Sequence, residues 1–298
     1  MEKAKVYFTK ELTPEKVLEM YRLLGKELPG RVACKVHSGE DGNQNYLRPE
    51  FWKPMIDAVK GTVVECNTAY PGERDTTDKH KKLIKDHKWD SYFDVDIMDA
   101  SEEVSLPIEN GKQLDEDIVG KDLLNYDSML VLSHFKGHPM GGFGGALKQL
   151  SIGYASSNGK TNIHSGGARK KGNNIMTDGS FDTPQDIFLE SMADAAGAVV
   201  RHFNGNIAFI NVAKNLSVDC DCVGDGQAAD PCMEDIGIFV SLDPVAIDQA
   251  CIDMVRASDD PGKETFMERV NSRHGTHTID TAYELGVGNK EYELIVID

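Results

Sequence analysis

The feature of this sequence that most restricts its fold is a regular alternation of strand-like and helix-like segments. Strand patterns occur at 5–9, 31–38, 62–67, 92–98, 128–133, 206–212, 236–241 and 292–297. Helix patterns lie between them at 14–24, 49–59, 76–87, 184–203 and 244–255, several with proline in the first turn. This alternation predicts an α/β protein with a mostly parallel sheet and helices on both faces.

The length of 298 residues allows one large α/β domain or two smaller lobes. We expect a single domain over 1–298, within which lobes at 1–150 and 186–298 would place a site between them. The segment 155–182 is rich in Ser, Gly, Asn and Lys and is predicted to be a long loop joining these lobes. A loop of this length inside a compact domain is usually functional or mobile.

The formal net charge of −17 argues against nucleic acid and membranes as partners, because such a field repels phosphates and anionic lipids. A small anionic ligand remains compatible with it, since lysines and histidines can reverse the potential inside a cleft. The N-terminal residues contain no apolar signal segment, and no apolar run approaches the roughly 20 residues that span a bilayer. We therefore expect a soluble cytoplasmic protein with reduced cysteines.

Ionisable and polar side chains follow several predicted strands directly, at the point where ligands bind in open parallel sheets. After successive strands they are Lys35, His37 and Glu40; then Asn67 and Tyr70; then His134, Lys136, His138 and Lys148; and then Asp219, Cys220 and Cys222. Each residue alone is compatible with a solvated loop. Their coincidence at consecutive strand ends predicts a functional site at one edge of the sheet.

The segment LSHFKGHPMGGFGGALKQL at 132–150 is the most informative of these loops. Its glycines, including Gly144 and Gly145, permit close backbone approach, and the helix that follows could offer N–H groups to an anion. His134 and His138 could bind a metal ion through neutral imidazoles. The alternative is a tight turn with surface histidines. The phosphate-binding pattern GxxxxGK[ST] is not present.

The cysteines fall into two groups. Cys34 and Cys251 occupy apolar positions and are predicted to be core residues, whereas Cys66 ends a strand and is ambiguous. A further group, Cys220, Cys222 and Cys232, lies in an Asp-rich loop, where thiolates suit zinc or an Fe–S centre. Because C-x-C with a third cysteine ten residues on is a weaker signature than paired C-x-x-C, ligation and a plain loop both stay open.

Segments along most of the chain resemble the domain of unknown function 362 family, whose members are often labelled uncharacterised Fe–S-centre proteins. The matching segments, in family order, are KVHSGEDGNQNYLRPEF, CNTAYPGERDTTDKH, LSHFKGHPMGGFGGALKQLSIGYASSNGK, NVAKNLSVDCDC and DIGIFVSLDPVAIDQACIDMV. Many members carry an inserted ferredoxin module after the lysine–histidine segment. The corresponding interval here, 164–186, contains no cysteine. The resemblance therefore implies that any Fe–S centre would use Cys220, Cys222 and Cys232, with a histidine as a further candidate ligand.

The family's core is also distantly similar to nickel-pincer lactate racemase-type proteins, an analogy that carries little weight for function. With the family motifs transferred residue by residue, an enzyme on a small anionic substrate is the leading hypothesis. A metal ion or Fe–S cluster would be held by His134, His138, Asp219, Cys220, Cys222 and Cys232. The catalytic groups would be His37, Lys136, Lys160 and His164. The substrate would contact Lys35, Glu40, Asn67, Tyr70, Gly144, Gly145 and Lys148.

Redox chemistry is favoured within this hypothesis, because the ferredoxin modules of other members imply delivery of electrons to this core. A separate electron-transfer protein would then be a partner, but an acidic ferredoxin would not dock easily on so acidic a chain. Isomerisation or hydrolysis therefore competes. The alternative class is a non-catalytic carrier or sensor of a metal or cluster, which would keep its thiols exposed. A flavin or nucleotide binder ranks last, since the GxGxxG fingerprint is missing.

Overall fold

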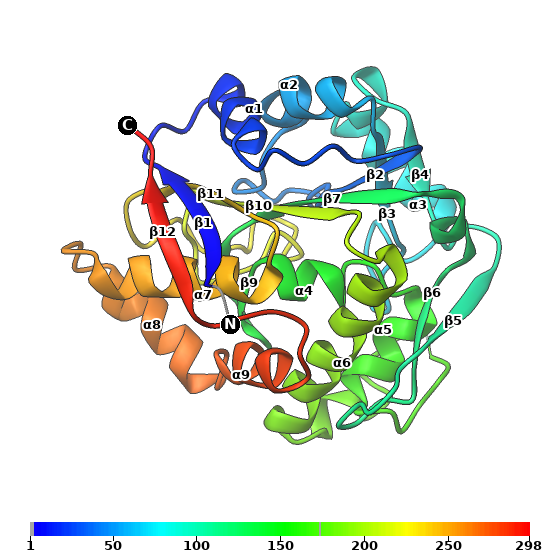
Figure 1. Ribbon diagram of the computed structural model, residues 1–298. Coiled ribbons are helices and arrows are strands. Elements are labelled where there is room, and N and C mark those ends of the chain that lie inside the picture. Colours follow the sequence, from blue (N-terminus) through cyan, green and yellow to red (C-terminus); the bar gives the residue numbers. More distant parts are fainter. Residues whose placement is uncertain (1–2, 173) are drawn as a thin grey trace.

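The computed structural model describes residues 3–172 and 174–298. In these residues the central sheet has eight strands, in the order β12-β1-β11-β10-β7-β2-β3-β4. They are β1 (Ala4–Thr9), β2 (Val32–Lys35), β3 (Thr62–Glu65), β4 (Val95–Ile97), β7 (Ser128–His134), β10 (Ile207–Ala213), β11 (Gly237–Ser241) and β12 (Tyr292–Val296). Neighbours run parallel, except that β11 is antiparallel to both β1 and β10. The predicted α/β class with a mostly parallel sheet is confirmed (Figure 1).

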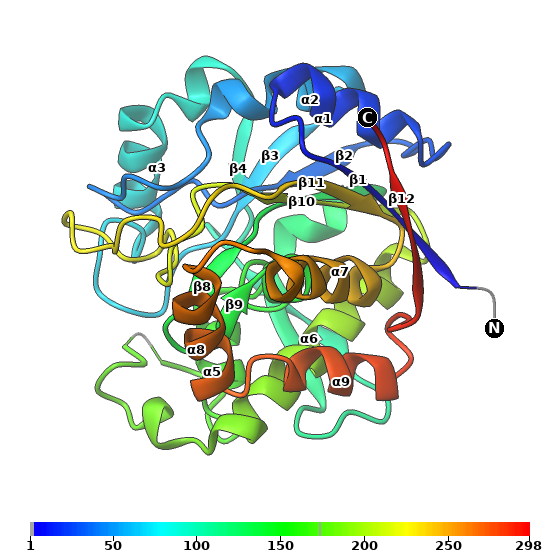
Figure 2. The ribbon, with the colours of Figure 1, turned by 90° about the vertical axis from the view of Figure 1, so that its left-hand side faces the viewer.

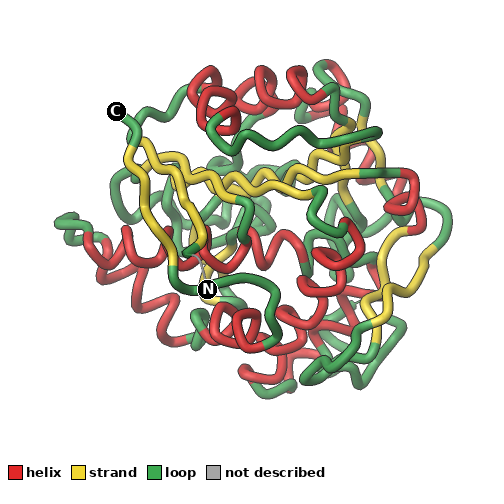
Figure 3. Tube along the Cα trace, viewed as in Figure 1, coloured by secondary structure: helices red, strands yellow, loops and turns green. Residues whose placement is uncertain are grey.

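Helices cover both faces of this sheet, as the alternating pattern predicted. One face carries α1 (Pro14–Arg22), α2 (Pro49–Val59) and α3 (Thr77–Asp86). The other carries α4 (Ala146–Leu150), α5 (Ser157–His164), α6 (Gln185–Phe203), α7 (Pro244–Ala257), α8 (Lys263–Ser272) and α9 (His277–Glu284). Figures 1 and 2 show the two helical layers on opposite sides, and Figure 3 shows the strands between them. Short 3₁₀ helices are η1 (Trp89–Ser91), η2 (Lys121–Asn125) and η3 (Ser180–Asp182).

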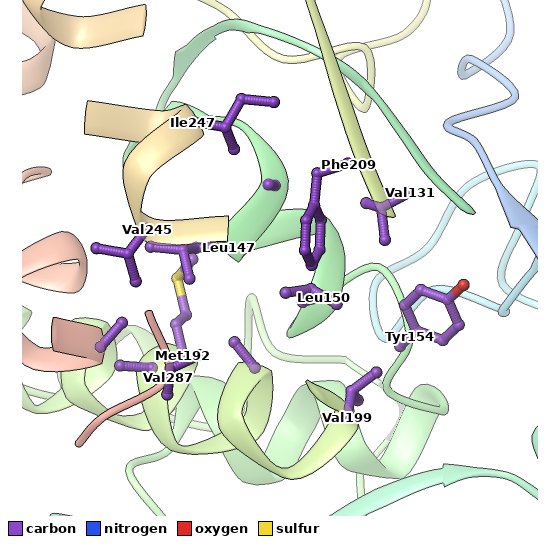
Figure 4. Close-up of a cluster of buried hydrophobic side chains, with 14 of the residues drawn as sticks. Val131, Leu147, Leu150, Tyr154, Met192, Val199, Phe209, Val245, Ile247 and Val287 are labelled. Carbon is purple, nitrogen blue, oxygen red and sulfur yellow. The ribbon is translucent and has the colours of Figure 1, made fainter. Parts of the chain in front are cut away.

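The core consists of two apolar clusters, one on each face of the sheet. Along β7 the side chains alternate between them, with Val131 in the cluster below the sheet and Leu132 in the one above. In the lower cluster Val131 and Phe209 of the sheet lie over Leu150 of α4 and Met192 of α6 (Figure 4). Burial on both faces explains why the strands of this sheet read as continuous apolar runs.

Two helix starts follow from side-chain capping. The Thr13 hydroxyl accepts the N–H of Lys16 at 3.2 Å, and the first residue of α1 is a proline. The Asp243 carboxylate accepts the N–H groups of Val245 and Ala246, each at 2.9 Å, at the start of α7. Both helices begin where the sequence placed them.

The segment 155–182, predicted to be a loop, contains helix α5. The Ser156 hydroxyl caps it by accepting the N–H of Gly159 at 3.0 Å. The prediction is wrong at these residues because α5, with the sequence SNGKTNIH, is polar and nevertheless buried, so it lacks an apolar stripe.

Two hairpins also escaped prediction, β5 (Glu103–Pro107) with β6 (Glu116–Gly120) and β8 (Lys136–His138) with β9 (Gly142–Gly144). The strand expected at 92–98 is shorter, because a 3₁₀ turn precedes β4.

Strands from both halves of the chain share the one central sheet. The division into two lobes stays a prediction. Of the helices in 3–172 and 174–298, none combines the length and apolar character that crossing a membrane requires.

Candidate functional site

The carboxyl ends of β10, β7, β2 and β3 lie next to one another in the sheet, and these strands run parallel. The loops that follow them meet helix α5 around a cavity of about 300 Å³. Of the site residues predicted from sequence, those that line this cavity are Lys35, His37, Tyr70, His138, Lys148, Lys160, His164 and Cys222. Those that are not in its lining are Glu40, Asn67, His134, Lys136, Gly144, Gly145, Asp219, Cys220 and Cys232.

A buried ion pair forms the floor of the site. The ammonium of Lys35 lies 2.7 Å from Oε2 of Glu65, and both side chains are almost fully buried. Glu65 also accepts the N–H of Ser38 at 2.7 Å and its hydroxyl at 2.8 Å. Burial opposes its ionisation, but the nearby basic groups, of which Lys35 contributes most, together outweigh burial and hold the pKa of Glu65 well below its usual range. Lys35 is therefore already engaged with a carboxylate.

A second buried pair joins Arg74 to Glu40, with 3.1 Å between Nε and Oε2. Arg74 also donates to the Tyr70 hydroxyl at 2.9 Å. Glu40, predicted to contact substrate, thus serves as the counter-ion of Arg74. Sequence inspection did not single out Arg74 or Glu65, although both line the cavity.

A third group connects two predicted residues through Asp221. Its carboxylate lies 2.9 Å from Nδ1 of His134 and 2.9 Å from the ammonium of Lys136. The other ring nitrogen of His134, Nε2, lies 2.5 Å from the carbonyl oxygen of Lys214. Both ring nitrogens therefore face oxygen acceptors of the protein, and His134 is not one of the residues that gather as a possible metal group. The metal-ligand role of His134 stays a prediction that this geometry does not support.

Asp219 and Cys232 also lie apart from the metal ligands that were predicted with them. Asp219 accepts the N–H of Ala229 at 3.0 Å and pairs with Arg269 at 3.2 Å. The thiol of Cys232 donates to the carbonyl of Leu216 at 3.2 Å. These contacts hold the loop together.

His138, Cys220 and Cys222 form the group that could hold a metal ion. Each offers one ligand atom, and these atoms lie within 4.8 Å of one another. Two thiolates and one imidazole, with a position left for substrate, form a donor set known from catalytic zinc sites.

An Fe–S cluster does not fit the same residues, because it needs further thiolates. A further cysteine, Cys66, also lines the cavity. Its thiol donates to the Tyr154 carbonyl at 3.3 Å, and Cys66 is not part of the group that could hold a metal ion.

Positive charge surrounds the sulfur of Cys220. The ammonium of Lys148 lies 3.7 Å from Sγ. Burial opposes ionisation, but a hydrogen bond from Cys222 and the charges of Lys148 and Lys136 hold the pKa of Cys220 well below its usual value. The same hydrogen bond raises the pKa of Cys222. Within the pair, Cys220 is therefore the more acidic thiol and Cys222 the less acidic one.

Hydrogen bonds set the tautomers of the histidines around this pair. Nδ1 of His138 accepts the N–H groups of Met140 at 3.1 Å and Gly141 at 2.8 Å. Nδ1 of His37 accepts the N–H of Gly39 at 3.0 Å. Burial lowers the pKa of both rings, that of His37 to about 4, so each is neutral and carries its proton on Nε2. Both rings interact with Cys220, and binding of a metal at Nε2 of His138 would have to displace that proton.

His164 has the opposite tautomer. Its Nδ1 lies 2.7 Å from the carbonyl oxygen of Lys160, which can only accept, so the proton is on Nδ1 and Nε2 is free to accept one. Burial lowers the pKa of His164 to about 4. The ring also stacks on Phe188, with 4.9 Å between ring centroids.

Lys160 differs from Lys35, Arg74 and Lys136, which pair with carboxylates. Its ammonium donates to the Ala155 carbonyl at 2.5 Å, and in the described residues it forms no ion pair with a carboxylate. Asp99 is close enough to favour its charge, but that carboxylate accepts the N–H groups of Asn67 at 2.9 Å and Ser157 at 3.0 Å. Burial, helped by the charge of Lys35, lowers the pKa of Lys160.

The remaining predicted residues have structural roles. Asn67 donates from its amide to Thr77 at 3.0 Å. The start of α4, expected to offer N–H groups to an anion, is already capped, because Asp248 accepts those of Ala146 at 2.7 Å and Leu147 at 2.9 Å. A Cβ at Gly145 would lie 2.3 Å from the same carboxylate. Glycine is therefore required there by the cap.

Comparisons with known proteins identify a family and several solved structures, including two with distant similarity. No curated protein matches the chain. The lactate racemase apoprotein from Thermoanaerobacterium thermosaccharolyticum is 14% identical with a TM-score of 0.39, and the match covers 69% of this chain and 50% of that one. A Thermotoga maritima protein from structural genomics is 11% identical with a TM-score of 0.45, covering 88% of this chain and 60% of that one. This chain thus spans less than two thirds of either.

The model of the family described as "Domain of unknown function (DUF362)" matches residues 32–253. The matched range contains β2 to most of α7, and with them all the loops that surround the cavity. It confirms the resemblance drawn from the sequence motifs. Since the match covers most of its length, this chain belongs to the DUF362 family.

Proposed function

We propose that this protein is an enzyme that binds a small anionic molecule in the cavity and transfers a proton to or from it. The observation that carries the proposal is Lys160, a buried lysine in the cavity wall that has no carboxylate partner among the described residues. An unpaired charge inside a protein is costly, so a group of this kind is stabilised when a ligand supplies the counter-ion.

Three other cations of the site already pair with a carboxylate. These pairs are Lys35 with Glu65, Arg74 with Glu40, and Lys136 with Asp221, while the ammonium of Lys148 lies 3.7 Å from Sγ of Cys220. Among the described residues, Lys160 is therefore the cavity cation that has neither a carboxylate partner nor a contact with a thiol sulfur. This balance supports a substrate with a single carboxylate or similar charge at its Lys160 end.

Of the three cavity histidines, His164 is the one whose tautomer leaves Nε2 able to accept a proton from the substrate. It lines the cavity, and its Nε2 has a free lone pair. His37, the other candidate for this role, presents an Nε2–H group toward Cys220 and is a hydrogen-bond donor. Proton transfer by a positioned histidine contributes typically about 10²–10⁴-fold to a rate.

A single metal ion at Cys220, Cys222 and His138 would add Lewis-acid polarisation of the substrate. Because Nδ1 of His138 accepts two N–H groups and Nε2 carries the proton, the two thiols are the stronger ligands of this donor set. Burial of Cys220 beside an organic-ligand cavity supports an enzyme over a carrier, which needs thiols that a partner can reach. Redox chemistry with a separate electron-transfer protein stays a prediction.

The experiment is a calorimetric titration of wild-type protein and Lys160→Gln with acetate, oxalate, glycolate, isovalerate, phenylacetate and phosphate. The matched control is Lys53→Gln, because Lys53 is exposed on α2. We expect at least one anion of this panel to bind wild type and Lys53→Gln equally, and Lys160→Gln at least tenfold more weakly. Equal affinity of Lys160→Gln for every anion that binds would refute the proposal, as would binding of none.

A further inference from the structure

Apolar side chains line part of the cavity that holds the cations. They include Met140, Ile152, Ile175, Met176 and Phe181. Two of them are unusual for large apolar residues, because Met176 is 56% exposed and Phe181 is 49% exposed. Both therefore present apolar surface to water at the opening of the cavity, where a bound molecule would cover it.

These two residues lie in a segment that hydrogen bonds from backbone N–H groups hold in place. Ile175, next to Met176, is buried and donates its N–H to the Ala69 carbonyl at 2.8 Å, in the loop after β3. Phe181 lies in η3, and the preceding Ser180 donates its N–H to Asp178 at 2.8 Å. The apolar side chains are thus held at the opening by backbone contacts, in the same cavity as Lys160 and His164 of α5.

The cavity volume limits what can bridge the two walls. About 300 Å³ lies at the lower end of the range for small-molecule sites, and it is enough for one ring or branched chain with its charged group. A very small hydrophilic anion would leave Met176 and Phe181 in water. An apolar group placed against them would remove that surface from water and add to its affinity.

We propose that the substrate is an amphipathic anion, a carboxylate or similar group that carries an aromatic ring or a branched alkyl chain. Its charged end lies at Lys160 and its apolar end lies against Met176 and Phe181. The inference rests on the proposed function, because it assigns the anionic end to the same lysine. It goes further by naming the apolar segment 175–181 as the determinant of specificity.

The test compares ligands that share a carboxylate and differ in the apolar group. Acetate, isovalerate and phenylacetate are titrated into wild type, into the double variant Met176→Ser/Phe181→Ser and into Leu124→Ser. Leu124 is 50% exposed, lies in η2 and is absent from the cavity lining, so its variant controls for loss of an exposed apolar residue. Thermal unfolding of each variant checks that it is folded.

We expect wild type and Leu124→Ser to bind phenylacetate or isovalerate at least tenfold more tightly than acetate. The double variant should lose most of this preference and keep its affinity for acetate. Equal binding of all three carboxylates by wild type, or an unchanged preference in the double variant, would overturn the inference and leave the proposed function intact. Loss of carboxylate binding altogether would overturn both. Phenylacetamide, the neutral analogue of phenylacetate, should bind more weakly than phenylacetate.

Discussion

At the scale of single residues, the site is organised by which nitrogen of each histidine carries the proton. His37 and His138 accept backbone N–H groups at Nδ1, whereas His164 faces a carbonyl there. The first two therefore act as donors toward Cys220, and His164 alone of the three keeps an Nε2 lone pair. Residue type alone does not distinguish these roles, because all three are histidines in polar segments of the chain.

This assignment predicts a direct spectroscopic result. In long-range ¹H–¹⁵N correlation spectra at pH 7, His37 and His138 should show the Nε2–H tautomer and His164 the Nδ1–H tautomer. Variants His37→Gln, His138→Gln and His164→Gln assign the signals. An Nε2–H tautomer for His164 would contradict its role as a proton acceptor.

The metal group predicts different effects for two cysteines of the same loop. Cys220→Ser should lose most of any bound zinc, because the Cys220 thiolate lies within 4.8 Å of the other two ligand atoms. Cys232→Ser should keep it, because that thiol donates to a carbonyl outside the group. His138→Ala should lower the affinity without abolishing it. The measurement is the zinc content of each variant after equilibration with zinc. Equal zinc content in Cys220→Ser and Cys232→Ser would contradict the assignment of Cys220 as a ligand.

Asp117 on β6 predicts a pH dependence of stability. Neither carboxyl oxygen has a hydrogen-bond partner in the part of the chain that the structure describes, and burial raises the pKa of Asp117 to about 8. The folded protein then binds the proton more tightly than the unfolded chain, so stability falls as pH rises from about 4 to about 8. At about 1.4 kcal/mol per pKa unit, the loss amounts to several kcal/mol.

Asp117→Asn should therefore remove this decline, and its advantage over wild type should grow from pH 5 to pH 8. Urea unfolding at these pH values measures it. Parallel curves for the two proteins would show that Asp117 does not titrate in this way.

At the scale of elements, the pattern of the chain predicts those that bury an apolar face. The helix expected at 49–59 is α2, and the apolar run at 128–133 lies within β7. Helix α5 escaped prediction because it is polar and buried, with Lys160 and His164 in the lining of the cavity, so the 3.6-residue apolar repeat is lost. Elements that serve the site are therefore the ones that hydrophobic periodicity identifies least well.

The position of the site was predictable from the sequence, but the ion pairs within it were not. Polar residues at strand ends indicated the edge, because parallel strands bring their carboxyl ends together. Glu65 was not recognised, since it ends a strand and its partner Lys35 is 30 residues away. Arg74 was missed because nothing in its loop distinguishes it from a solvated arginine. Which lysine lacks a partner depends on the sheet order, and that order is set by tertiary packing.

The cap of α4 predicts a large effect on stability. Asp248→Ala would leave the N–H groups of Ala146 and Leu147 and the amide of Asn211 buried without their acceptor. We expect a loss of about 3 kcal/mol in the free energy of unfolding, measured with urea. Asp259→Ala, at an exposed position after α7, should change it by less than about 0.5 kcal/mol. Similar values for both would contradict the capping role.

At the scale of the whole molecule, a strongly acidic chain encloses a cavity rich in cations. The net charge of −17 repels polyanions, whereas Lys160 forms no ion pair with a carboxylate among the described residues. Met176 and Phe181 line the same cavity as that cation. This combination selects a small molecule with one charged and one apolar end.

The most direct test of this claim is a crystal structure of the protein with 4-bromophenylacetate, in which anomalous scattering locates the bromine. We expect the carboxylate within hydrogen-bond distance of the Lys160 ammonium and the bromine beside Met176 and Phe181. A ligand that binds outside the cavity, or with its bromine at Lys160 and its carboxylate in the apolar segment, would contradict it.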